Sequence, residues 1–165
     1  MPSWKERIKL KSRELLRSLL LEIFLKRNQE FKSFRREHMS LSAKRYSTIS
    51  ELHNSTFHYD IYITGSDQVW NENKIYDDNS FFCDFAPKGK KIISFGASVT
   101  TNTLTVEYKK RLEEQLSKYS AIGVRETSSV PLLRNMQLGN NVEIINTCDP
   151  SLLLDASDYD KLAEQ

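Results

Sequence analysis

The sequence is poor in cysteine, glycine and proline, with 2, 5 and 4 of these residues among 165. So few cysteines exclude a disulfide-rich secreted scaffold, and Cys83 and Cys148 are interpreted as free thiols of a reducing compartment. No apolar run reaches the roughly 18 residues that a membrane-spanning helix needs. The most apolar stretch, residues 15–25, contains Arg17 and Glu22. No signal-peptide pattern is present, so we expect a cytoplasmic protein.

Several common chemical motifs are also missing. There is no Gly-x-Gly-x-x-Gly motif and no Gly-x-x-x-x-Gly-Lys-Ser/Thr motif, which excludes the usual dinucleotide- and nucleotide-binding loops. His38, His53 and His58 have no metal-ligand spacing with cysteines or carboxylates, so we expect neither a metal nor a cofactor. No nucleic-acid-binding motif accompanies the basic residues, and we expect no nucleic-acid partner.

Charge divides the chain into two parts. Residues 1–45 hold 13 Lys+Arg and 5 Asp+Glu, a net charge of +8, whereas residues 46–165 hold 11 and 17, a net charge of −6. Residues 4–38 carry apolar side chains at helical spacing and contain neither glycine nor proline, which predicts a helix. We therefore predict a basic helical arm over residues 1–45 and an α/β domain over residues 46–165.

The role of the basic arm stays open at this point. Its Lys/Arg-rich face is either a solvated helix face or a surface that contacts anionic lipid. The second interpretation predicts a cytoplasmic protein held peripherally at the inner face of the membrane. Alternatively, Leu19, Leu20 and Phe24 cover an apolar face, either within the chain or in a homo-oligomer.

Short apolar runs alternate with helical patterns over the rest of the chain. Strands are predicted within 59–64, 91–97, 121–124 and 142–147, and helices over 105–119, over 127–138 and from an N-cap at Ser157 onward. This alternation predicts an α/β fold, with a Rossmann-like, mostly parallel sheet and flanking helices. Because the runs are continuously apolar, we expect the strands to be buried on both faces.

The predicted site lies where these strands end, because parallel sheets bind ligands at their carboxyl edge. Gly65 and Gly96 lack the Cβ that would obstruct a ligand, and serine hydroxyls can bond to sugar hydroxyls or phosphate oxygens. Asp67 either binds hydroxyls or only caps its loop. Six strand-end residues are predicted to bind substrate: Gly65, Ser66, Asp67, Ser98, Arg125 and Asp149.

Arg125 is the leading candidate among them. It follows the third predicted strand and precedes a helix expected to begin near Ser128, with Pro131 in its first turn. A guanidinium beside a helix N-terminus predicts an anion site, where the arginine bond, on the order of 1.5–3 kcal/mol, outweighs the helix dipole, at about 0.3–1 kcal/mol. The alternative is a salt bridge from Arg125 to Glu126 or Asp149.

Four segments of the chain resemble the polysaccharide pyruvyl transferase family: YDIYITGSDQVWN, FFCDFAPKGKKIISFGAS, SAIGVRETSSVPLL and DPSLLL. The resemblance covers residues 31–165 and is most specific in GSDQVW. It implies the transfer of a pyruvyl ketal from phosphoenolpyruvate to two hydroxyls of a sugar in a cell-surface or lipid-linked glycan. It also implies a fold like the N-terminal half of a GT-B-like enzyme.

The resemblance also implies roles for particular residues. Arg125 resembles the family arginine that holds the phosphoenolpyruvate anion, and the loop of residues 65–68 resembles part of the cleft wall. Trp70 is expected to pack beneath this loop or to contact a sugar. The family histidine belongs to a second domain that is expected to be absent. The catalytic residue is therefore unassigned, and we expect this chain alone to be incomplete and inactive.

Two other functions stay open beside this one. The chain is alternatively a non-catalytic module that binds an anion or a glycan, or one half of a GT-B glycosyltransferase. One departure from the family pattern bears on the choice. After Ser98 the sequence continues with Val99 and Thr100, where family members commonly have an aromatic residue and a glycine.

Overall fold

The chain divides into two compact units, Met1–Arg45 and Tyr46–Gln165. The computed structural model describes the backbone of residues 4–75, 77–101, 103–139 and 142–163, and the side chains within these ranges from Leu20 onward. In this described part of the chain, no helix combines the length and the hydropathy needed to span a bilayer.

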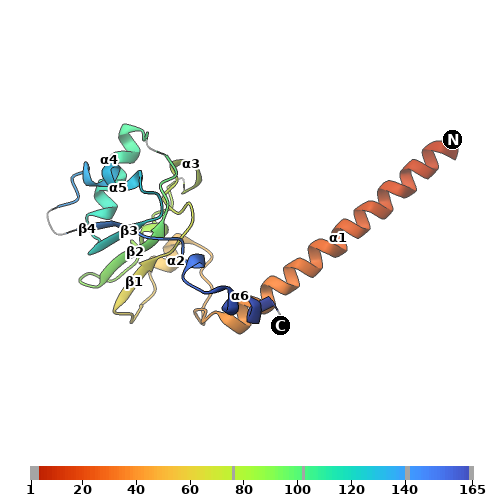
Figure 1. Cartoon of the computed structure of the whole chain (residues 1–165), viewed down its shortest axis with the longest axis horizontal. Coiled ribbons are helices and arrows are strands. Elements are labelled where there is room, and N and C mark those ends of the chain that lie inside the picture. The colour runs from red at the N-terminus through yellow and green to blue at the C-terminus, as the bar shows by residue number, and fades with distance from the viewer. Residues whose placement is uncertain (1–3, 76, 102, 140–141, 164–165) are drawn as a thin grey trace. The chain divides into compact units, whose positions relative to one another are not determined.

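The first unit is built on one long helix, α1 (Trp4–His38) (Figure 1). Its 35 residues confirm the helix predicted over residues 4–38. Local polar pairs such as Lys26 and Glu30, 3.9 Å apart, lie along its surface. From Leu20 onward its large apolar side chains are between 48% and 64% exposed, so these side chains are not buried in a core: Leu20, Leu21, Ile23, Phe24, Leu25, Phe31 and Phe34.

The second unit contains a four-stranded, all-parallel sheet in the order β1-β2-β3-β4. This arrangement confirms the predicted α/β fold with a parallel sheet. Tyr62 lies opposite Ile92 in the first pair of strands, and Ile122 lies opposite Ile144 in the last. The strands are β1 (Ile61–Thr64), β2 (Lys91–Ala97), β3 (Ala121–Val124) and β4 (Glu143–Asn146).

Helices connect the strands and flank the sheet (Figure 1). The Thr105 hydroxyl accepts a hydrogen bond from the backbone N–H of Tyr108, which caps the helix between β2 and β3. The helices are α2 (Ile49–His53), α3 (Glu72–Ile75), α4 (Val106–Leu116), α5 (Ser129–Arg134) and α6 (Ala156–Ala163), with 3-10 turns η1 (Ser80–Phe82) and η2 (Pro150–Leu152).

Three details of the helix predictions are wrong. α5 has six residues, because the chain leaves the helical conformation at Asn135. α6 begins at Ala156, so Ser157 lies inside its first turn and is not its N-cap. α2 and α3 were not among the predicted helices, because their four or five residues are too few to produce a helical pattern in sequence.

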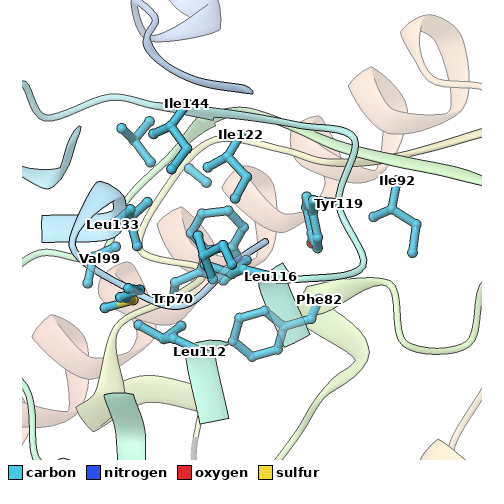
Figure 2. Packing of buried hydrophobic residues seen from close by; sticks show 14 of the residues in the cluster. Trp70, Phe82, Ile92, Val99, Leu112, Leu116, Tyr119, Ile122, Leu133 and Ile144 are labelled. Carbon is cyan, nitrogen blue, oxygen red and sulfur yellow. The ribbon is translucent and has the colours of Figure 1, made fainter. Parts of the chain in front are cut away.

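The core of the second unit lies between one face of the sheet and the helices α4 and α5. Figure 2 shows Ile122 and Ile144 of the strands with Leu112 and Leu116 of α4 and Leu133 of α5. Leu112, Leu116, Ile122 and Leu133 are fully buried. Trp70 and Phe82, from the connection between β1 and β2, complete this core.

The expectation that the strands are buried on both faces is wrong for β1. Tyr62 and Thr64 are buried, but Ile61 and Ile63 are 50% and 58% exposed. The side chains of α4 and α5 pack into the core with Tyr62, and Ile61 and Ile63 point to the opposite face because side chains alternate along a strand. Ile145 of β4 is exposed in the same way.

Candidate functional site

A network of charged and hydroxyl side chains lies at the carboxyl edge of the sheet. Arg125, directly after β3, donates from Nη1 to Asp149 Oδ2 at 2.8 Å and from Nε to Glu126 Oε1 at 3.3 Å. Ser66, after β1, donates to Asp149 Oδ2 at 2.9 Å. Ser98, after β2, donates to Glu126 Oε1 at 2.7 Å. The ends of all four strands therefore meet around one guanidinium.

A bulge at the end of β2 shapes this edge. The register between β2 and β3 shifts between Ser94 and Ala97, and Gly96 within the shift has φ +67°. A Cβ on Gly96 would lie 3.1 Å from Pro150 Cδ. Gly96 is therefore needed for close packing of the chain after β4, and not for the approach of a ligand. Gly65 differs, since nothing lies within 4 Å of a Cβ built there.

Trp70 anchors the loop that follows β1. Its backbone N–H donates to the Ser98 carbonyl at 3.1 Å, and its indole Nε1 donates to the Phe81 carbonyl at 3.4 Å. Its own carbonyl accepts from the Tyr108 hydroxyl at 2.9 Å, and its ring stacks on Phe82. Because Trp70 is fully buried, the prediction that it packs beneath the loop is confirmed, and contact with a sugar is excluded in this conformation.

The network favours the charged forms of Asp149 and Arg125. The backbone N–H of Ser151, the Arg125 guanidinium and the hydroxyls of Ser151 and Ser66 hold the pKa of Asp149 well below its usual range. The hydrogen bond to Asp149 raises the pKa of Arg125 in turn. The formal charges of Arg125, Asp149 and Glu126 sum to −1.

Arg125 forms the salt bridge that was predicted as the alternative to an anion site, and it pairs with both Glu126 and Asp149. A guanidinium has five N–H donors, and these two contacts use Nε and one N–H of Nη1. The predicted support from a helix N-terminus is weak, because α5 begins only at Ser129 and the Ser128 side chain makes no capping bond. Any anion bound here would rely on the remaining guanidinium donors.

The six predicted site residues do not form one cluster. Ser66, Arg125 and Asp149 are joined directly. Ser98 is joined through Glu126 and is fully buried, so its hydroxyl positions a carboxylate and does not face solvent. Gly65 and Asp67 are exposed beside the network. Within the described residues, no three His, Cys, Asp or Glu side chains converge as a metal site requires.

Asp67 belongs instead to a hollow of about 430 Å³ beside this loop. Its non-glycine backbone has φ +90°, a conformation that concentrates at functional sites. This hollow was not predicted from the sequence. The lining residues are Asp67, Gln68, Val69, Lys74, Ile75 and Phe81.

Comparison with known families identifies the family of the chain. The family model described as polysaccharide pyruvyl transferase matches residues 4–164. The chain belongs to this family. No curated protein and no solved structure matches it.

Membership in the polysaccharide pyruvyl transferase family indicates a transferase. The match extends the resemblance predicted over residues 31–165 toward the N-terminus, so that it includes the whole of α1 as well as the α/β unit up to residue 164. The sequence segments that carried the resemblance contain Ser66, Arg125 and Asp149. GSDQVW, the segment in which the predicted resemblance is most specific, is the loop that Trp70 anchors.

Proposed function

We propose that the α/β unit binds phosphoenolpyruvate at the carboxyl edge of its sheet, as part of an enzyme that pyruvylates a sugar of a cell-surface or lipid-linked glycan. The observation that carries the proposal is the guanidinium of Arg125 at this edge in a member of the polysaccharide pyruvyl transferase family. Parallel α/β sheets bind their ligands at this edge. Gly65 leaves open space beside it.

The proposed reaction forms a cyclic ketal. Two hydroxyl oxygens of one sugar bond to C2 of phosphoenolpyruvate, and the bond from C2 to the phosphate oxygen breaks. One hydroxyl proton goes to C3, which becomes a methyl group, and the other leaves with inorganic phosphate. Arg125 would stabilise the negative charge of the donor through its remaining N–H groups.

The carboxylates of Asp149 and Glu126 orient Arg125 and limit how tightly it can bind an anion. Asp149 and Glu126 hold the guanidinium of Arg125 from two sides, which fixes its plane before any ligand arrives. They also give the network a net charge of −1. We therefore expect Arg125 to bind an anion less tightly than an unpaired arginine would, because like charges nearby oppose the added negative charge.

The proposal extends to a peripheral contact of α1 with anionic lipid, where a lipid-linked acceptor would reside. The Phe24, Phe31 and Phe34 side chains are exposed, and residues 1–45 carry a net charge of +8. Exposed aromatic side chains with basic neighbours favour binding to an anionic membrane surface. A homo-oligomer formed through the same side chains is the competing outcome.

Calorimetry with phosphoenolpyruvate tests the donor site. Wild-type protein is expected to bind, and Arg125→Ala is expected to lose about tenfold or more in affinity through the lost charged hydrogen bonds. Arg35→Ala in α1 is the matched control, since it removes a guanidinium outside the α/β unit. Unchanged binding by Arg125→Ala would refute the proposed site. Binding of nucleotide-sugars without phosphoenolpyruvate would favour a glycosyltransferase.

A further inference from the structure

We infer that the hollow beside Asp67 is a subsite for a neutral sugar ring, with Phe81 as the surface on which the ring stacks. The choice of ligand rests on the proposed function, since a pyruvyl transferase needs an acceptor sugar near its donor. The location of the subsite is inferred from the geometry of the hollow. Its volume of about 430 Å³ falls in the range of roughly 300–1,000 Å³ that small-molecule sites occupy.

Phe81 presents a fixed aromatic surface. Its side chain is 42% exposed, although Phe82 beside it is fully buried. Its backbone carbonyl accepts hydrogen bonds from Thr64 Oγ1 at 3.1 Å and from Trp70 Nε1 at 3.4 Å. These bonds anchor the backbone to the end of β1 and to the buried indole. An exposed ring on an anchored backbone loses little conformational entropy when a ligand stacks on it.

Asp67 is also held in place by its backbone. Its carbonyl accepts from the N–H groups of Val69 at 2.8 Å and Ser98 at 3.0 Å, and it pairs with Ala97 in an isolated parallel bridge. These contacts maintain φ +90° in a residue that is not glycine. The Asp67 carboxylate makes no hydrogen bond or ion pair with another described residue. It is therefore available to accept from hydroxyl groups.

The remaining polar groups of the hollow are donors. Gln68 uses its Oε1 to accept from Asn71 Nδ2 at 3.1 Å, which leaves its amide N–H groups available. The Lys74 ammonium makes no ion pair within the described residues. One carboxylate and one ammonium make the hollow neutral overall, so it favours an uncharged ligand over phosphoenolpyruvate.

The floor and wall of the hollow are apolar. Ile75 is almost fully buried beneath it, and Val69 and Phe81 complete its apolar surface. A pyranose ring matches this mixture, because its C–H face packs on an aromatic ring while its hydroxyls reach the polar groups at the edge. The combination of a carboxylate acceptor, amide and ammonium donors and an exposed ring therefore favours a sugar over a purely apolar ligand.

The position of the hollow suits an acceptor. Asp67 pairs with Ala97 on one side, and the Arg125 backbone N–H donates to the Ala97 carbonyl at 3.0 Å on the other. Neighbouring strands lie about 4.8 Å apart, so the backbones of Asp67 and Arg125 are roughly 10 Å apart across Ala97. A sugar in the hollow would thus lie next to a donor bound at Arg125, on the same edge of the sheet.

Saturation-transfer NMR with methyl glycosides of galactose, mannose and glucose tests this subsite. At least one glycoside is expected to bind wild-type protein and to bind Phe81→Ala about tenfold more weakly. Asp67→Asn keeps the side-chain size and removes the charge, and it is also expected to weaken binding. Phe31→Ala in α1 is the matched control, because it removes an exposed phenylalanine ring from the other unit. Circular dichroism checks that each variant is folded.

The outcomes separate the subsite from the proposed function. Sugar binding that depends on Phe81 and not on Arg125, together with phosphoenolpyruvate binding that depends on Arg125 and not on Phe81, supports both. Sugar binding through Phe81 without phosphoenolpyruvate binding supports the subsite and refutes the donor site. Phosphoenolpyruvate binding with none of the three glycosides bound refutes the subsite, as does equal sugar binding by wild type, Phe81→Ala and Asp67→Asn.

Discussion

The two units of the chain place their apolar side chains differently. In α1 the large apolar side chains from Leu20 onward are about half exposed or more, whereas Leu112, Leu116 and Leu133 of the second unit are fully buried. Both units contain regular helices with apolar residues at helical spacing. The difference is that α4 and α5 pack against a parallel sheet, whereas the described residues 4–45 of the first unit include no strand.

This contrast separates the tasks of the two units. A buried apolar side chain stabilises its own unit, because its surface is removed from water when the unit folds. An exposed apolar side chain contributes little to folding and remains available to a partner surface. We therefore expect substitutions in the second unit to change stability, and substitutions in α1 to change binding.

The largest expected difference is between two leucines. Leu112→Ala in α4 should destabilise the second unit by about 2–5 kcal/mol, because it leaves a cavity in a fully packed core. Leu20→Ala in α1 makes the same chemical change at a side chain that is 58% exposed, and it should stay within about 0.5 kcal/mol. Urea denaturation measures both. Equal losses would mean that α1 is buried in solution and would break the comparison.

A smaller difference is expected between two glycines of the second unit. A Cβ on Gly123 would lie 2.8 Å from the Ser94 carbonyl oxygen and 2.8 Å from Thr147 Cγ2. Gly123→Ala should therefore cost about 1–3 kcal/mol, since a strand backbone cannot shift freely. Gly65→Ala meets nothing within 4 Å and should change stability by about 0.5 kcal/mol or less. Thermal denaturation measures the stability of the two variants. If Gly123→Ala is as stable as wild type, the close packing described around Gly123 is contradicted.

The sequence predicted the fold well where patterns are long or strongly apolar. The bounds of α1, β2 and β3 agree with the prediction, because 35 residues without glycine or proline and short apolar runs leave few alternatives. The exposure of β1 could not be predicted in the same way. An apolar run shows that a strand can be buried, but which face is covered depends on where helices from other parts of the chain pack.

The candidate site was predictable to a similar extent. The strand-end rule brought Ser66, Arg125 and Asp149 together correctly, because parallel strands end at one edge. It could not show that Ser98 is buried, since that depends on how the loop after β1 packs on Ser98, whose backbone bonds to Asp67 and Trp70. Phe81 was missed as a lining residue because its exposure is set by contacts of its backbone, which leave no mark on the side-chain pattern.

The expectation that α1 binds an anionic membrane surface can be tested with vesicles. Wild-type protein should co-sediment with vesicles of phosphatidylcholine and phosphatidylglycerol, and added salt should weaken the association. The double variant Lys32→Gln, Arg35→Gln should bind about thirtyfold more weakly, at about 1 kcal/mol for each lost charge. Lys109→Gln, Lys110→Gln in α4 is the matched control. Association that is insensitive to salt, or equal on pure phosphatidylcholine, would rule out an electrostatic contact.

The smallest effect on stability is expected at Asp149. The network around Asp149 is partly exposed, so its exposure lies between that of the apolar side chains of α1 and that of the buried core of the second unit. The pKa of Asp149 is lowered in the folded protein, chiefly by the Ser151 backbone N–H and by Arg125. A lowered folded-state pKa means that the stabilisation is fully present above the ordinary aspartate pKa of about 3.9 and is lost as the pH falls through the folded value. Asp149→Asn should thus be less stable than wild type at pH 7, and the difference should shrink below about pH 4.

Denaturation of wild type, Asp149→Asn and Asp160→Asn over a pH series checks this linkage. Asp160 lies on α6 and makes no hydrogen bond or ion pair with another described residue, so its substitution removes one charge without removing a contact. If the difference between wild type and Asp149→Asn stays constant down to the lowest pH at which the protein folds, the carboxylate is not held by charge. Asp149 would then only shape the turn at Ser151, and the Arg125 network would lose its electrostatic basis.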